Sequence, residues 1–322
     1  MPTTTNRLVN TNGVQLRVTE AGDRGAPVVI LAHGFPELAH SWRHQIPVPA
    51  AAGYHVLAPD QRGYGGSSQP DEVEAYDIEA LTTDLVGLLD DLDVERAVWI
   101  GHDWGAVVTW NAPILHPDRV LAVAGLSMPP LPRPPVPPTQ ALQMMFGDNF
   151  FYILYFQQPG VADTDLNADP ARTMRRMLGG LASPTDTAAA ARMMAPGPTG
   201  FVDRLSEPET LPKWISPAEF DHYVTEFGRT GFTGPLNWYR NLDRNWEITA
   251  ARAGATIAVP ALFMGGTADP VLTFAPPDGA EQLVSGPFQA VMLDGAGHWL
   301  QQERPDEVNA TLLDFLNGLG LR

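Results

Sequence analysis

The stretch Gly101-His102-Asp103-Trp104-Gly105 decides the fold of this chain. An apolar run, residues 97–100, precedes it, and a second apolar run, residues 106–110, follows it. This order predicts a buried strand, a sharp turn and a helix, with a glycine two positions before and two positions after Asp103. Glycines fit there because so tight a turn leaves no room for side chains beside its central residue. Alone, the pattern fits a nucleophile presented at a turn and an ordinary capping aspartate equally well.

Two later runs end in the residues that a nucleophile at such a turn requires. Residues 259–264 read as a strand followed by Asp269, and residues 288–293 read as a strand followed by His298. An acid and then a histidine, each placed after a strand and C-terminal to the nucleophile, is the order of a hydrolase triad. The sequence therefore predicts Asp103, Asp269 and His298 as catalytic residues.

A fourth part of the predicted site lies near the N-terminus. Residues 26–32 form a nearly continuous apolar run, typical of a strand in a parallel sheet, and lead into His33-Gly34-Phe35-Pro36. The loop after such a strand and the residue after the nucleophile each donate one backbone N–H to an oxyanion hole. Those donors would belong to Phe35 and Trp104. Pro36 has no N–H, so we expect it to shape the loop, and a cis peptide bond is one way to do so.

With these residues in place, the chain resembles the soluble epoxide hydrolases of the α/β-hydrolase superfamily. The matching stretches are His33-Gly34-Phe35-Pro36-Glu37, Ser41-Trp42-Arg43, Asp60-Gln61-Arg62-Gly63-Tyr64-Gly65, Gly101-His102-Asp103-Trp104-Gly105, Phe151-Tyr152-Ile153-Leu154-Tyr155-Phe156, Asn237-Trp238-Tyr239-Arg240 and Gly297-His298-Trp299. They cover nearly the whole chain and keep the family's order. The resemblance implies an α/β-hydrolase fold: a mostly parallel central sheet flanked by helices, with an inserted helical cap, or lid, domain.

The organisation of the chain fits that fold. We expect further strands at residues 14–21, 54–59 and 120–126, and amphipathic helices at residues 74–92 and 307–319. The proline-rich residues 129–138 exclude both a helix and a central strand, so they read as the linker out of the sheet domain. The stretch that follows loses its strand signals and is rich in Met, Phe, Trp and Tyr, which predicts a mostly helical cap. The predicted domains are residues 1–133 (first part of the core), 134–248 (cap) and 249–322 (second part of the core).

An aspartate nucleophile implies a particular chemistry. A carboxylate is ionised at neutral pH, so Asp103 can attack an sp3 carbon directly and form an alkyl-enzyme ester. His298 would then activate the water that attacks the ester carbonyl, while Asp269 holds the imidazole. The oxyanion formed in this step would lie between the N–H groups of Phe35 and Trp104.

Opening an epoxide also creates an alkoxide, which needs a proton donor such as a phenol. Tyr152 and Tyr239 occupy the two positions where soluble epoxide hydrolases carry their paired tyrosine acids. Tyr155 lies one helical turn from Tyr152 and is the alternative for the first acid. The substrate pocket is expected to be lined by Pro36, Val107, Tyr155, Val271 and Trp299.

Composition limits the partners and the compartment. With 322 residues, 44% of them hydrophobic, the chain can fill a sizeable core. No stretch is apolar enough for a membrane span, and residues 1–13 are polar, without the apolar region of a signal peptide, so we expect a cytoplasmic protein. The absence of cysteine excludes disulfides and thiolate chemistry. A formal net charge of −17 disfavours nucleic acid and anionic membranes.

The expected partner is a small-molecule epoxide, and the aromatic-rich cap is compatible with a homodimer. We expect no cofactor and no metal. Residues 63–68 carry Ser68 where a G-x-G-x-x-G dinucleotide loop has its last glycine, and no helix start follows. His40 and His44 have no third ligand beside them.

Two alternatives stay open at this point. A haloalkane dehalogenase shares the fold, the aspartate and a tryptophan like Trp104, but its halide leaving group needs no proton, and its loop usually carries Asn where this chain has Phe35. A non-catalytic ligand receptor of the same fold would not require Asp103, Asp269 and His298 together.

Overall fold

The computed structural model of the chain describes residues 3–180 and 187–322. These residues divide into two compact units. The first, which we call the core unit, comprises the described residues of Met1–Ser68, Ile78–Pro132 and Gly254–Arg322. The second, which we call the cap unit, comprises Gln69–Asp77 and the described residues of Arg133–Ala253.

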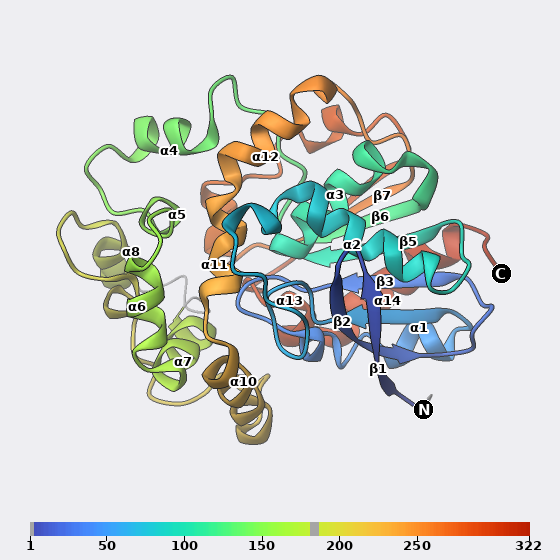
Figure 1. Cartoon of the computed structure of the whole chain (residues 1–322), viewed down its shortest axis with the longest axis horizontal. Helices are drawn as coiled ribbons and strands as arrows, with labels where there is room; N and C mark the ends of the chain where they lie inside the picture. Colours follow the sequence, from blue (N-terminus) through green and yellow to red (C-terminus); the bar gives the residue numbers. More distant parts are fainter. Residues whose placement is uncertain (1–2, 181–186) are drawn as a thin grey trace. The chain divides into compact units, whose positions relative to one another are not determined.

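The core unit is built on one eight-stranded sheet (Figure 1). Its order is β1-β2-β4-β3-β5-β6-β7-β8. The strands are β1 (Thr5–Thr11), β2 (Val14–Ala21), β3 (Val28–Ala32), β4 (His55–Pro59), β5 (Ala97–His102), β6 (Val120–Leu126), β7 (Ala261–Gly266) and β8 (Phe288–Leu293). β1 and β2 pair antiparallel, as do β2 and β4, and the other pairs are parallel. Every residue of β3, β4 and β5 is buried, which explains why their sequences are apolar apart from His55 and His102.

Helices cover the two faces of this sheet. The helical elements of the core unit are η1 (Ala39–Trp42), α1 (Pro47–Ala51), α2 (Ile78–Asp90), α3 (Trp104–Leu115), η3 (Pro117–Arg119), η5 (Pro270–Thr273), η6 (Ala280–Leu283), α13 (Leu300–Glu303) and α14 (Pro305–Gly318). Leu31 of β3 and Ile100 of β5 share one buried cluster with Leu312 and Leu316 of α14. α3 packs on β5 and β6 and touches α2. Because successive strand residues point to opposite faces, this double cover favours apolar residues on both faces of the central strands.

Most predicted elements of the core are confirmed, and two differ. The expected helix at residues 74–92 begins only at Ile78, because Asp77 takes extended backbone with φ −71° and ψ 166° and ends the short η2 helix (Val73–Tyr76). β1 was not predicted at all. Its residues are mostly polar and exposed at the sheet edge, so they lack the apolar alternation of a half-buried strand.

The cap unit is helical, as predicted, and no strand occurs among its described residues. Its other elements are α4 (Pro138–Phe146), α5 (Tyr152–Tyr155), α6 (Val161–Asn167), α7 (Pro170–Gly180), α8 (Thr187–Met194), α9 (Phe201–Arg204), α10 (Pro217–Thr230), α11 (Thr233–Arg240), α12 (Leu242–Ile248) and η4 (Thr249–Arg252). Over the described part of the chain, no helix is long and apolar enough to cross a membrane.

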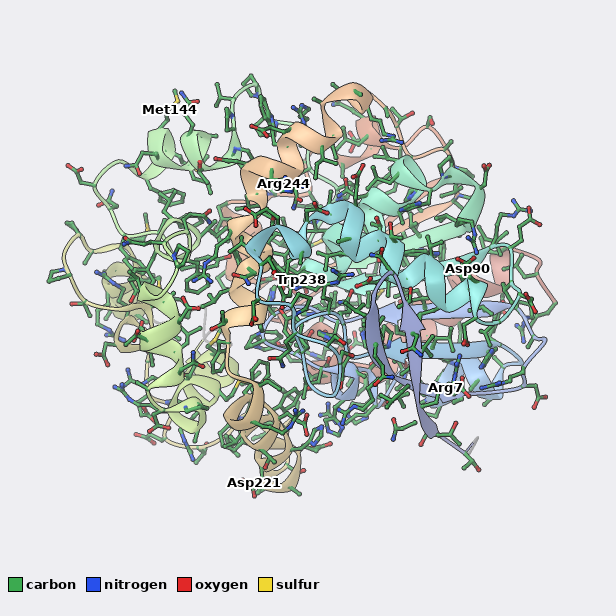
Figure 2. The ribbon with its side chains drawn as sticks, in the orientation of Figure 1. Arg7, Asp90, Met144, Asp221, Trp238 and Arg244 are labelled. Atoms are coloured by element: carbon green, nitrogen blue, oxygen red, sulfur yellow. The ribbon has the colours of Figure 1, made fainter. Side chains whose placement is uncertain are left out.

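The η2 segment is tied to the α11–α12 region of the cap unit. The buried Asn241 donates its side-chain amide to the carbonyl of Val73 at 2.6 Å. Arg244 forms an ion pair with Asp77 at 2.9 Å. Trp238 and Arg244, which Figure 2 labels on this ribbon, come from α11 and α12. Side-chain contacts therefore join residues 69–77 to the rest of the cap unit, which lies far away in the sequence.

Candidate active site

Asp103 occupies the predicted sharp turn between β5 and α3. Its backbone has φ 52° and ψ −118°, a conformation that non-glycine residues rarely adopt. A Cβ on Gly101 would stand 2.1 Å from the carbonyl oxygen of Gly105, and a Cβ on Gly105 would stand 2.0 Å from that of Ala32. Both glycines are therefore required by close backbone approach, as the sequence predicts.

The structure brings together the three residues that the sequence analysis took from the ends of separate strands. Asp269 follows β7, and its Oδ2 lies 2.9 Å from Nδ1 of His298. The other ring nitrogen of His298, Nε2, lies 3.6 Å from Oδ2 of Asp103. Asp269 is fixed in turn, because its Oδ1 accepts the backbone N–H of Val271 at 2.8 Å. The imidazole of His298 thus lies between two carboxylates, and the N–H of Val271 orients that of Asp269.

The loop after β3 meets the other carboxylate oxygen of Asp103. The N–H of Phe35 donates to Oδ1 of Asp103 at 2.8 Å. The peptide bond between Phe35 and Pro36 is cis, so the form of the loop that the sequence suggested is confirmed. Trp104, the second predicted N–H donor, is the first residue of α3 and follows Asp103 directly. The carboxylate of Asp103 is therefore held by a backbone donor on one oxygen and faces His298 with the other.

Burial and neighbouring charges shift the pKa values of both His298 and Asp103. Burial alone would lower the pKa of His298, but the charge of Asp269 and the interaction with Asp103 raise this pKa well above 6.5. Burial would raise the pKa of Asp103, yet His298 and the Phe35 N–H hold it below its usual range. Both shifts favour the charged forms, a carboxylate at Asp103 and an imidazolium at His298.

In the cap unit, the two predicted tyrosine acids are neighbours. Tyr152 opens α5 and Tyr239 lies near the end of α11, and their ring centroids are 6.1 Å apart at an interplanar angle of 77°. Tyr155 is placed differently, because its hydroxyl donates to Oδ2 of Asp165 at 3.3 Å. Burial and the Asp165 charge raise the pKa of Tyr155 to about 12. Tyr152 and Tyr239 therefore form a pair that does not include Tyr155.

Known proteins match both units of the chain. The family model described as alpha/beta hydrolase fold matches residues 27–305. Epoxide hydrolase A of Mycobacterium tuberculosis is 72% identical over 99% of this chain and 99% of that protein. Epoxide hydrolase 3 of Siraitia grosvenorii is 39% identical over 96% of this chain and 97% of that protein. The crystal structure of Epoxide Hydrolase A from Mycobacterium thermoresistibile has a TM-score of 0.96 at 66% identity, covering 98% of this chain and 99% of that one.

The chain belongs to the epoxide hydrolase family. This confirms the family and the α/β-hydrolase fold with which the sequence was associated.

This epoxide hydrolase family member also contains a buried polar network that the sequence analysis missed. Glu37 and His102 have no exposed surface, and their Oε2 and Nδ1 atoms are 2.7 Å apart. The other nitrogen of His102 lies 2.8 Å from the carbonyl oxygen of His298, which also accepts the hydroxyl of Ser127 at 2.6 Å. Both ring nitrogens of His102 therefore face oxygen atoms that can accept a hydrogen bond. The contacts with His102 and Ser127 thus hold the backbone carbonyl of His298 in place.

Glu37 completes the same network. Burial would raise the pKa of Glu37, but the charge of His102 holds it below its usual range. Its second oxygen, Oε1, accepts the side-chain amides of Gln301 and Gln302, each at 2.9 Å. The only sequence signal was that Glu37 and His102 stand inside the motifs of the family resemblance, where no role was derived for them.

The expected pocket residues are spread over both units of this family member. Pro36, Val107 of α3, Val271 of η5 and Trp299 belong to the core unit, and Tyr155 belongs to the cap unit. Trp299 is fully buried, and its ring lies 4.7 Å from that of His298, centroid to centroid. Among the residues that the structure describes, no group of three His, Asp or Glu side chains could hold a metal ion.

Proposed function

We propose that this member of the epoxide hydrolase family converts epoxides to vicinal diols through a covalent ester on Asp103. One observation carries the proposal: Asp103 is an ionised carboxylate with one oxygen on the N–H of Phe35 and the other facing His298. A serine nucleophile would need a base to remove its proton, whereas this carboxylate is ready to attack an electrophilic carbon.

The first step is alkylation of Asp103. A carboxylate oxygen forms a bond to one epoxide carbon, and the bond between that carbon and the epoxide oxygen breaks. The oxygen leaves with the electron pair and takes a proton from Tyr152 or Tyr239, so that it becomes a hydroxyl of the product. The bond between Tyr155 and Asp165, together with the raised pKa of Tyr155, supports Tyr152 as the first acid, because a poorer acid transfers its proton less readily.

The second step is hydrolysis of the ester. Esterification removes the negative charge of Asp103, and with it one of the two carboxylates that raise the pKa of His298. His298 then releases its proton, which restores the phenol of the tyrosine that acted as the acid. As a neutral imidazole it accepts a proton from water, whose oxygen attacks the ester carbonyl, while Asp269 stabilises the imidazolium. The N–H groups of Phe35 and Trp104 would receive the oxyanion. Collapse of this intermediate breaks the bond to the substrate oxygen, which takes a proton from His298 and leaves as the diol. The carboxyl group of Asp103 then gives its proton to His298, which restores the resting pair.

The remaining details of the proposal concern the substrate and the setting. Pro36, Val107, Tyr155, Val271 and Trp299 are proposed to line the pocket for an epoxide of apolar character. We propose that the enzyme works in the cytoplasm and needs no cofactor, and its aromatic-rich cap is compatible with a homodimer.

An isotope experiment tests the covalent step. In a single turnover in heavy-oxygen water, the label should enter the carboxylate of Asp103, and the first diol should carry an unlabelled oxygen from the enzyme. His298→Gln should accumulate the ester, visible as a mass increase of the intact chain, because alkylation needs no base. Label found directly in the first diol would instead mean that water attacks the epoxide itself.

A substrate comparison tests the choice of reaction. Diol formation from styrene-type, terminal alkyl and fatty-acid epoxides should exceed halide release from matched 1-bromoalkanes. Faster halide release would indicate a dehalogenase. If neither class reacts and His298→Gln carries no ester, a receptor function would be the better account.

A further inference from the structure

The two helices that carry the proposed acids are too short to hold their own positions. α5 has four residues and α11 has eight, and isolated helices of this length are unstable in water. The placement of Tyr152 and Tyr239 must therefore come from contacts with the rest of the cap unit. Ring packing supplies part of it, since Phe156 lies 5.5 Å from Tyr152 and 5.1 Å from Tyr239, centroid to centroid.

Arg240, the last residue of α11 and the chain neighbour of Tyr239, joins the two helices from one side. Its Nε donates to the carbonyl of Phe156 at 3.1 Å, and Phe156 is the residue that ends α5. Nη1 of Arg240 donates to Oδ1 of Asn237 at 2.8 Å, and its guanidinium forms an ion pair with Asp163 at the start of α6. The guanidinium therefore spans three helices with bonds in fixed directions.

Gln157 joins the same helices from the other side. Its side-chain amide donates to the carbonyl of Tyr239 at 3.1 Å and to the carbonyl of Ile153 at 2.8 Å. The two links are reciprocal: the residue after Tyr239 donates to the end of α5, and a residue just beyond α5 donates to Tyr239 itself. In addition, the N–H of Phe156 donates to the carbonyl of Tyr152 at 2.9 Å. Tyr239 therefore directly precedes Arg240, and its own carbonyl accepts the hydrogen bond from Gln157. Tyr152 is linked by one backbone hydrogen bond to Phe156, whose carbonyl accepts the hydrogen bond from Arg240.

The surroundings of Arg240 make this link rigid. Its side chain is 3% exposed and that of Asp163 is 14% exposed, so solvent competes little for their bonds. Burial would raise the pKa of Asp163, but hydrogen bonds from Arg240 and Thr233 lower it, which keeps the carboxylate charged. Asp163 is itself fixed, because it accepts the N–H of Gly160 at 2.8 Å.

We propose that Arg240 and Gln157 are positioning residues for the alkylation step, which hold the phenols of Tyr152 and Tyr239 at the separation needed to serve one epoxide oxygen. The inference rests on the proposed function, because it assumes that these two tyrosines are the acids. Two donors can share one oxygen only if their separation is held, and small displacements of a catalytic group have large effects on rate.

The test separates positioning from ordinary stabilisation by measuring the two chemical steps apart. The variants are Gln157→Leu and Arg240→Gln, studied in the full chain with styrene oxide. The matched control is Arg176→Gln, because Arg176 on α7 is also little exposed, at 13%, and pairs with Glu207 at 2.7 Å. Rapid quenching and intact mass give the rate at which the ester forms and the rate at which it disappears.

We expect Gln157→Leu and Arg240→Gln to slow ester formation about 10- to 100-fold, since general acids contribute factors of this order or more. Hydrolysis of the ester uses no tyrosine proton, so its rate should change less than about threefold. Arg176→Gln should leave both rates near those of the unchanged chain. In a Tyr152→Phe, Tyr239→Phe background, the same substitutions should cause no further loss of ester formation, because there is no phenol left to place.

Several outcomes would overturn the inference. Equal losses in both steps, or the same loss in Arg176→Gln, would mean that Arg240 only stabilises the cap. If Arg240→Gln does not fold, Gln157→Leu, which removes no charge, decides alone. Normal ester formation in Gln157→Leu and Arg240→Gln, combined with its loss in the double phenylalanine variant, would reject the positioning role and leave the acids intact. Normal ester formation in the double phenylalanine variant would reject the acids and the positioning role together.

Discussion

Gly34 offers the sharpest test of how the carboxylate of Asp103 is placed. A Cβ at this position would stand 2.4 Å from Cβ of Asp103, 2.6 Å from its Oδ1 and 2.8 Å from the carbonyl oxygen of His102. Ordinary contact begins at 3.4 Å, so Gly34→Ala requires a displacement of 3.4 − 2.4 = 1.0 Å at Asp103. The backbone of Gly34 has no positive φ, so alanine itself fits the main chain there.

A shift of this size should affect catalysis more than folding. We expect Gly34→Ala to slow ester formation on Asp103 by about 10²-fold, because misplacing a reacting group by about 1 Å has that effect. Crowding of a packed region should also lower the free energy of unfolding by about 1–3 kcal/mol. The assays are single-turnover ester formation, followed by intact mass, and thermal unfolding.

The control is Gly318→Ala at the end of α14. A Cβ there would meet nothing within 4 Å, and alanine favours a helix over glycine by about 0.5–1 kcal/mol. This variant should react normally and unfold at the same temperature or slightly higher. Ester formation in Gly34→Ala within about threefold of the unchanged chain would refute the claim that close packing on Gly34 fixes Asp103.

Three further predictions follow from the site. Tyr152→Phe with Tyr239→Phe should reduce ester formation by about 10²-fold or more, measured in a single turnover, while either single variant keeps part of the activity. Because the pKa of His298 is raised above 6.5, its imidazolium stabilises the fold fully below pH 6.5, and this contribution is lost as pH rises through the raised value. Calorimetry should therefore show a fall in melting temperature on the alkaline side that is weaker in His298→Gln. Asp165→Asn should lower the pKa of Tyr155 from about 12, seen by ultraviolet titration of the phenol, and leave ester formation unchanged.

The fold and the triad were predictable because both depend on local patterns. Asp103, Asp269 and His298 each follow an apolar strand, and the carboxyl ends of parallel strands meet at one edge of the sheet. The observation that each residue follows a strand was therefore enough to predict that they lie close together, although long stretches of chain separate them. The glycines beside Asp103 gave a second local signal, since their lack of a side chain can be read directly from the sequence.

The supporting contacts could not be predicted, because they join residues with no common pattern. Glu37 and His102 are 65 positions apart, and Arg240 and Asp163 are 77 positions apart. A buried charge has no periodicity, and its partner is determined only when the elements have packed. The same reasoning applies to residues 69–77, whose link to the cap depends on single contacts such as that between Asn241 and Val73.

The point at which the cap unit enters the sequence has a consequence for the evolution of such enzymes. The chain leaves the sheet after β6 and returns to it in β7, and these two strands are parallel neighbours with Val123 opposite Ala261 and Leu126 opposite Met264. Backbone hydrogen bonds fix this register whatever the length of the segment inserted between the strands. Insertions and deletions in the cap can therefore accumulate in one lineage without shifting Asp269 relative to Asp103.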